Sequence, residues 1–127
     1  MMNAKTELTG SDILDLKTYI GVRDQRRAEI LYKKKLRRVA VGPYATFYFE
    51  CFETMWYQVQ EMLRIEKGGE AQLKDELVAY NPLIPKGREL VATVMFEIDN
   101  ANIRTALLSG LGGVEENFIM QLDDEYI

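Results

Sequence analysis

The chain has 127 residues, of which 47% are hydrophobic and 28% charged, with a formal net charge of −4. This length suits one domain of ordinary size, and the composition is that of a soluble globular protein rather than a disordered or collagen-like one. The sequence has no histidine and a single cysteine, Cys51, which excludes a zinc finger, an internal disulfide and any catalytic triad with an imidazole base. We expect a single domain over residues 1–127.

The first third of the chain predicts two helices. Asp15 lies near the N-cap of a short helix that we expect to end near Gly21. A second helix is predicted from Asp24 to Leu36, because every residue there is compatible with a helix and the apolar residues have amphipathic spacing. The expected apolar stripe of this second helix consists of Ala28, Leu31, Tyr32 and Leu36.

The second predicted helix lies within a strongly basic stretch. Residues 23–38 contain eight basic and two acidic residues, a local balance of +6 that leaves −10 for the rest of the chain. Such a stretch is more often a solvated helix face than a binding surface. The alternative is a helix that grips RNA or DNA, but the sequence pI near 4.9 is well below that of a dedicated nucleic-acid-binding domain. We therefore expect no nucleic-acid partner.

Two strands and a strongly patterned helix follow the basic stretch. The β-branched run at 39–41 and the aromatic run at 45–50 predict two strands with a tight connection between them. The clearest helix of the sequence is predicted over 52–66, where apolar residues recur at helical spacing. Its apolar positions are Phe52, Met55, Trp56, Val59 and Leu63.

The second half of the chain predicts helices over 70–80 and 101–109, and strands over 90–98 and 117–122. Residues 90–98 are apolar on both faces, which indicates a strand in the middle of a sheet that is covered on both sides. The fold predicted from the residues is therefore an α+β single domain. Its mainly antiparallel sheet is centred on 90–98 and packed by helices, above all by the helix over 52–66.

No apolar run approaches the roughly 20 residues that a membrane-spanning helix needs. Residues 1–7 reach their first charges without the apolar core of a secretory signal. We expect a cytoplasmic protein that does not interact with a membrane.

The polar side of the helix over 52–66 supplies the candidate binding residues. Tyr57, Glu61 and Arg64 recur along one face of this helix, with Gln58 close by, so that they can converge on a small polar ligand. The alternative is that they form the solvated side of an amphipathic helix. Glu50 and Glu53 lie at the helix start, where the helix dipole favours carboxylates.

The glutamates of this group leave two interpretations open. Glu50, Glu53 and Glu61 are oxygen donors that suit a hard cation. A carboxylate-bridged di-iron site of the ferritin type, however, requires histidine, and a role at the helix N-terminus without a metal is favoured. We expect no catalytic residue, no metal and no cofactor.

Three motifs resemble a known family: VGPYATF at 41–47, QVQEMLR at 58–64 and YNPLIP at 80–85. They resemble the bacterial family named domain of unknown function 3501, and the similarity covers nearly the whole chain. The family has no established activity. Its members are often encoded beside rubrerythrin-like and iron–sulfur proteins, so the resemblance implies an iron or redox setting.

Two departures from the family affect what the resemblance implies. Members often have histidine where this chain has Tyr44, which weakens any metal role taken from the family. Members also usually extend some tens of residues past the position of Ile127, so the resemblance implies either a missing C-terminal element or a naturally short member. If a strand is missing, one sheet edge is left open for a partner.

These observations favour docking over catalysis. The leading hypothesis is a non-enzymatic accessory or protein-interaction domain in an iron or redox setting, which binds a protein partner or a second copy of itself. The alternative is a small-ligand-binding or metal-binding domain, enzymes included. Its candidate residues are Glu50, Glu53, Tyr57, Gln58, Glu61 and Arg64.

Overall fold

The protein is described here by a computed structural model. The structure describes residues 5–110, 119–122 and 125–126. Contacts divide the chain into two compact units, residues 1–96 and residues 97–127. In the described ranges, no helix combines the length and the apolar character needed to cross a membrane. The expectation that residues 1–127 form one domain stays a prediction.

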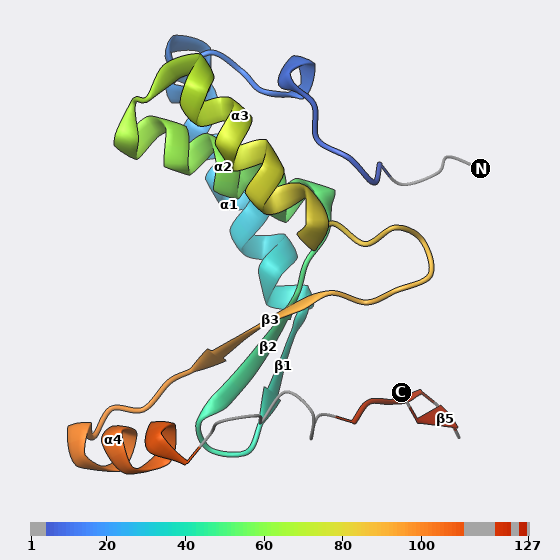
Figure 1. Cartoon of the computed structure of the whole chain (residues 1–127), viewed down its shortest axis with the longest axis vertical. Helices are drawn as coiled ribbons and strands as arrows, with labels where there is room; N and C mark the ends of the chain where they lie inside the picture. The colour runs from blue at the N-terminus through green and yellow to red at the C-terminus, as the bar shows by residue number, and fades with distance from the viewer. Residues whose placement is uncertain (1–4, 111–118, 123–124, 127) are drawn as a thin grey trace. The chain divides into compact units, whose positions relative to one another are not determined.

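The described part of the first unit consists of helices and a three-stranded antiparallel sheet, which confirms the predicted α+β class (Figure 1). The elements in chain order are η1 (Gly10–Asp12), α1 (Leu16–Leu36), β1 (Arg38–Val41), β2 (Ala45–Phe49), α2 (Phe52–Glu66), α3 (Gly69–Tyr80), η2 (Asn81–Leu83) and β3 (Ala92–Phe96).

One long helix, α1, replaces the two helices predicted for the first third of the chain. Asp15, which was expected near the N-cap, is the N-cap itself, because the Asp15 carboxylate accepts a hydrogen bond of 2.8 Å from the Thr18 N–H. The prediction that a helix ends near Gly21 is wrong. A glycine inside a helix costs only about 1 kcal/mol relative to alanine, and packing against α2 outweighs this.

The face that α1 turns to α2 differs from the predicted apolar stripe. That stripe is exposed: Leu31, Tyr32 and Leu36 show 48%, 66% and 70% of their surface to solvent. The buried residues of α1 are Tyr19 and Ile30. Between these two residues, at helical spacing, the contact face carries Arg23 and Arg26. A search for apolar residues at helical spacing therefore did not identify this face.

Helix α2 lies between α1 and α3 and supplies the centre of the core (Figure 1). Met55, Trp56 and Val59 are buried, which confirms the predicted apolar face. The Trp56 ring meets the Tyr19 ring edge-on, with 5.9 Å between centroids, and its indole N–H donates to the Asp12 carbonyl at 2.9 Å. The core therefore joins α2 to α1 and to the N-terminal segment.

Two side-chain amides hold the N-terminal segment on the helices. Asn81 accepts from the Leu8 N–H at 2.6 Å and donates to the Leu8 carbonyl at 2.9 Å. Gln60, which is 1% exposed, makes the same pair of bonds with the backbone of Leu14, at 2.7 and 3.3 Å. Each amide thus satisfies a donor and an acceptor of the backbone, as a neighbouring strand would.

The sheet has the order β1-β2-β3, with antiparallel pairing throughout. The two strands predicted around 39–50 are confirmed, and β2 is the central strand. The prediction that 90–98 forms the middle of the sheet is wrong, because β3 lies at an edge and Met95 and Phe96 are exposed. An apolar sequence on both faces did not indicate a central position here.

Register gives the sheet two unlike faces. Arg38, Tyr48 and Thr93 are direct neighbours across the strands and therefore share one face, which we call the polar face. The opposite face, which we call the apolar face, carries no charged or polar side chain. Its residues are Val39, Val41, Ala45, Phe47, Phe49, Ala92, Val94 and Phe96.

The second unit contains α4 (Ala101–Ser109) and a two-stranded antiparallel pair of β4 (Gln121–Leu122) and β5 (Glu125–Tyr126). The predicted helix over 101–109 is confirmed. Asn100 caps it, since its side-chain oxygen accepts from the N–H groups of Asn102 and Ile103 at 2.9 and 3.1 Å. Part of the last predicted strand, residues 117–118, lies outside the described residues.

Replacing Trp56 tests the core of the first unit. Trp56→Ala removes the edge-on contact with Tyr19 and the bond to Asp12, and leaves a cavity. We expect the free energy of unfolding to fall by about 3–5 kcal/mol, measured by urea denaturation. Val78→Ala is the control, because Val78 is 72% exposed on α3 and its loss should cost no more than about 0.5 kcal/mol. Equal midpoints for the two variants would place Trp56 outside the core.

Candidate functional site

The structure separates the six predicted binding residues into three groups rather than one site. One group joins α2 to the first half of α1, a second joins α2 to the second half of α1, and a third lines a cleft beside the sheet. In that order the groups are Glu61 with Arg64, Glu53 with Tyr57, and Glu50 with Gln58.

Glu61 is the centre of the first group. Arg23 donates to both of its oxygens, at 2.8 and 3.0 Å, and the Tyr19 hydroxyl donates at 2.7 Å. Arg64 adds two longer bonds from the next turn of α2, at 3.2 and 3.3 Å. The Arg23 guanidinium, helped by Tyr19 and Arg64, holds the pKa of Glu61 at about 2 against the opposing effect of burial. This carboxylate is fully engaged in joining α1 to α2.

The second group continues the same contact along α1. Glu53 lies 3.6 Å from the Lys33 ammonium, and the Lys34 ammonium lies 6.0 Å from the centre of the Tyr57 ring. Partial burial works against ionisation of Glu53, but hydrogen bonds at the helix N-terminus and Lys33 outweigh it and lower its pKa. Within the described ranges, no three cysteine, aspartate or glutamate side chains gather as a metal site. The expectation of no metal stays a prediction.

The third group opens onto a cleft of about 620 Å³ beside the polar face of the sheet. Glu50 is only 7% exposed, and its two oxygens accept from the hydroxyls of Thr54 and Thr93 at 3.0 and 2.8 Å. Gln58 donates to the Tyr80 hydroxyl at 3.4 Å. The lining residues are Leu31, Lys34, Lys35, Arg38, Tyr48, Glu50, Met55, Gln58, Tyr80, Leu83, Thr93 and Met95.

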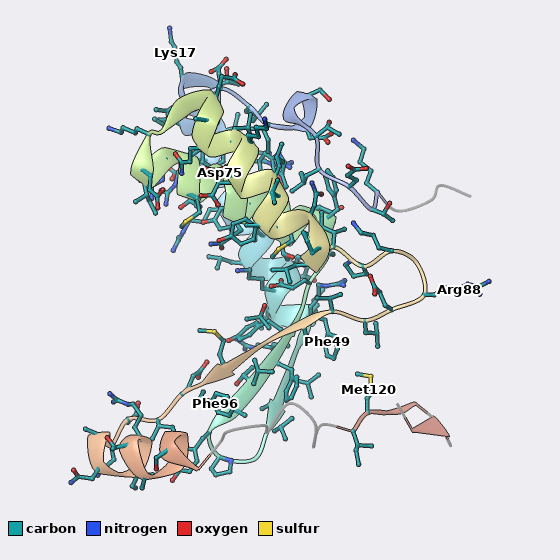
Figure 2. All side chains as sticks on the ribbon, in the orientation of Figure 1. Lys17, Phe49, Asp75, Arg88, Phe96 and Met120 are labelled. Atoms are coloured by element: carbon teal, nitrogen blue, oxygen red, sulfur yellow. The ribbon has the colours of Figure 1, made fainter. Side chains whose placement is uncertain are left out.

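Arg37 fixes the corner of the fold next to this cleft. Its guanidinium donates to the carbonyls of Phe49 and Glu50 at 2.8 and 3.2 Å, while the Phe49 N–H donates to the Arg37 carbonyl at 2.9 Å. These bonds fasten the junction of α1 and β1 to the junction of β2 and α2. In Figure 2, Phe49 marks the place where the sheet meets the helices. The last turn of α1 is thereby held beside the polar face.

The apolar face of the sheet is the second surface feature of the first unit. Val39, Val41 and Phe96 expose 50%, 49% and 38% of their surface, and none of the eight residues of this face is buried. None of them belongs to the core cluster found among the described residues. A contiguous apolar patch outside the core is one of the surface features at which proteins bind partners.

Sequence reasoning missed the residues that share the cleft with Glu50 and Gln58. Lys34, Lys35 and Arg38 were assigned to a solvated helix face, and Tyr48 and Thr93 to strands without a site. One signal was present, since Thr46, Tyr48 and Thr93 are polar residues in otherwise apolar strands and so mark one face of each strand. Nothing in the sequence indicated that this face lies beside the end of the basic helix.

The fold and its surfaces define an α+β protein, in which a three-stranded antiparallel sheet extends from a helical core. One face of this sheet is polar and the other is apolar. The chain belongs to the family of proteins of unknown function DUF3501, whose family model matches residues 7–127. This confirms the resemblance found in the sequence.

A solved structure agrees with this assignment. The chain is similar to a novel protein of unknown function from Burkholderia pseudomallei K96243, known from a crystal structure, with 40% sequence identity and a TM-score of 0.87. The match covers 93% of this chain and 67% of the other. No curated protein matches the chain.

Replacing Glu61 tests whether this carboxylate stabilises the fold. Because its pKa of about 2 in the folded protein is below its ordinary value of 4.5, its contribution to stability is complete above pH 4.5 and is lost as the pH falls towards 2. We expect Glu61→Gln to lower the free energy of unfolding at pH 7 by about 1.5–3 kcal/mol, the range for hydrogen bonds to charged groups.

Urea denaturation of the wild type and Glu61→Gln at pH 7 and pH 2 measures this difference, which should shrink at pH 2. Asp75→Asn on the exposed side of α3 is the control, with an expected change within about 0.5 kcal/mol at both pH values. A difference between wild type and Glu61→Gln that is the same at pH 7 and pH 2 would contradict the role of the ionised carboxylate.

Proposed function

We propose that this protein is a non-enzymatic interaction domain and that the apolar face of its sheet is the docking surface. The single observation that supports this proposal is the apolar composition of that face, on which Val39, Val41 and Phe96 are exposed. It carries eight apolar residues and no charged one, and it contributes nothing to the buried core of the described residues. A binding surface explains why such residues are kept outside the core.

The dimensions of the face indicate a transient interaction. Three strands about 4.8 Å apart, each about five residues long at 3.4 Å per residue, cover about 14 by 17 Å, or roughly 240 Å². A stable interface of standard size buries about 800 Å² on each partner. A partner that covers only this face would therefore bind weakly and reversibly, as an accessory protein does.

A second copy of the chain is the partner that we propose to test first. The apolar face has no charge that would repel its own copy, and two such faces can pack about a twofold axis as sheet on sheet. The iron or redox setting implied by the family resemblance stays a prediction. Ligation of a metal by the α2 glutamates is less well supported, because Glu61 and Glu53 form ion pairs with Arg23 and Lys33.

Charges placed on the apolar face test the proposal. We expect the wild type to self-associate as its concentration rises from about 10 μM to 1 mM, measured by sedimentation equilibrium, as a weak interface requires. The double variant Val39→Lys/Phe96→Lys should weaken this association at least tenfold, because each lysine puts a charge into an apolar contact.

The control is Ile65→Lys/Val78→Lys, which adds the same charge at exposed apolar positions of α2 and α3. Ile65 is 58% exposed and Val78 is 72% exposed. This control variant should associate like the wild type. A wild type that stays monomeric at 1 mM, or two double variants that associate equally, would rule out the apolar face as a surface for a second copy.

A further inference from the structure

The cleft on the polar face of the sheet carries an excess of positive charge that the fold does not use. Three cations line it, Lys34, Lys35 and Arg38, against one carboxylate, Glu50. Among the described residues, no carboxylate lies within 4 Å of any of these three cations. The Lys34 ammonium lies 6.0 Å from the centre of the Tyr57 ring. Clustered cations without counter-ions favour an anionic ligand.

Neighbouring basic residues show what structural cations look like in this protein. Lys33 pairs with Glu53, and Arg37 donates to two backbone carbonyls at the corner of the fold. The last turn of α1 also attracts cations through the helix dipole, which accounts for Lys34 and Lys35 in part. Arg38 lies beyond the helix, on β1, so that the dipole of the last turn does not explain its position.

The rest of the cleft limits what such an anion can be. Met55, Leu83 and Met95 give it apolar walls. Both Glu50 oxygens already accept from threonine hydroxyls, which favours a hydrogen-bonded floor over a metal site. A volume of about 620 Å³ lies within the range of roughly 300–1,000 Å³ that is usual for small-molecule sites. The cleft thus combines room for an apolar body with cations for an acidic head group.

We propose that this cleft binds a small organic anion, with a carboxylate or phosphate head at Lys35 and Arg38 and an apolar or aromatic body against Met55 and Leu83. Arginine suits both head groups because its guanidinium donates two parallel hydrogen bonds to either. The site lies on the opposite face of the sheet from the proposed docking surface, so the two proposals succeed or fail separately.

Three probes of similar body test the ligand class by isothermal titration calorimetry: 4-phenylbutyrate, 4-phenylbutyl phosphate and the uncharged 4-phenylbutanol. We expect at least one of the two anions to bind at a single saturable site, at least tenfold more tightly than the alcohol. Which anion binds more tightly distinguishes a carboxylate from a phosphate site. Backbone NMR shifts should move at Tyr48 and Thr93, on the polar face, and not at Val41, on the apolar face.

Removing two charges from the cleft tests the site itself. Lys35→Gln/Arg38→Gln should weaken binding of the anions at least tenfold. The control Lys17→Gln/Arg27→Gln removes the same charge from exposed positions of α1 and should leave binding unchanged. Figure 2 shows Lys17 at the end of α1 away from the sheet, and at 1.5 Å per residue it lies about 27 Å from Lys35 along the helix.

A third variant does not depend on the loss of lysine or arginine. Leu31 lines the cleft and is 48% exposed, so Leu31→Glu places a negative charge there at little cost to folding and should also weaken anion binding. Thermal unfolding confirms that each variant is folded. No saturable binding below about 10 mM, equal binding of the alcohol, or equal losses in the cleft and control variants would overturn the proposal.

Discussion

Contact between charged side chains of α1 and the face of α2 is the constraint on which the rest of the first unit depends. Arg23 and Tyr19 hold Glu61, and the Arg26 guanidinium lies 4.5 Å from the centre of the Trp56 ring. In a core this small, long side chains add to stability, because their aliphatic stems cover apolar surface while their charged ends are paired. Arg37 then fastens the end of α1 to the start of α2, which sets where the sheet leaves the helices.

The sequence predicted those elements whose pattern is local. Helix α2 has apolar residues at helical spacing, the helix at 101–109 has a capping asparagine, and the strands around 39–50 are β-branched and aromatic. The course of α1 was misjudged for two physical reasons. Gly21 was given more weight than its small free-energy cost warrants, and arginines occupy positions of the contact face where apolar residues were sought.

The candidate site was less predictable because it depends on long-range pairing. Glu50 and Gln58 were identified from α2 and the residue pair that precedes it, but the cations opposite them come from the end of α1 and the start of β1. The strand order was also not predictable from the sequence. The Glu50 N–H donates to the Val91 carbonyl at 2.8 Å, next to the pairing of β3 with β2, and the order β1-β2-β3 leaves β3 at an edge. The position of the cations opposite Glu50 and Gln58 and the order of the strands are not encoded in the spacing of residues along one segment. Both are needed to predict the two faces of the sheet.

The amide of Asn81, which binds the backbone of Leu8 through both its oxygen and its nitrogen, has a consequence for the chemical durability of the protein. Asparagine side chains are lost over time when the following backbone nitrogen attacks the amide carbon and forms a cyclic imide. Here the following residue is Pro82, whose nitrogen carries no hydrogen and cannot close that ring. Hydrolysis to aspartate would replace the donor facing the Leu8 carbonyl with an oxygen. The residue order at this position therefore protects the attachment of the N-terminal segment against this route of deamidation.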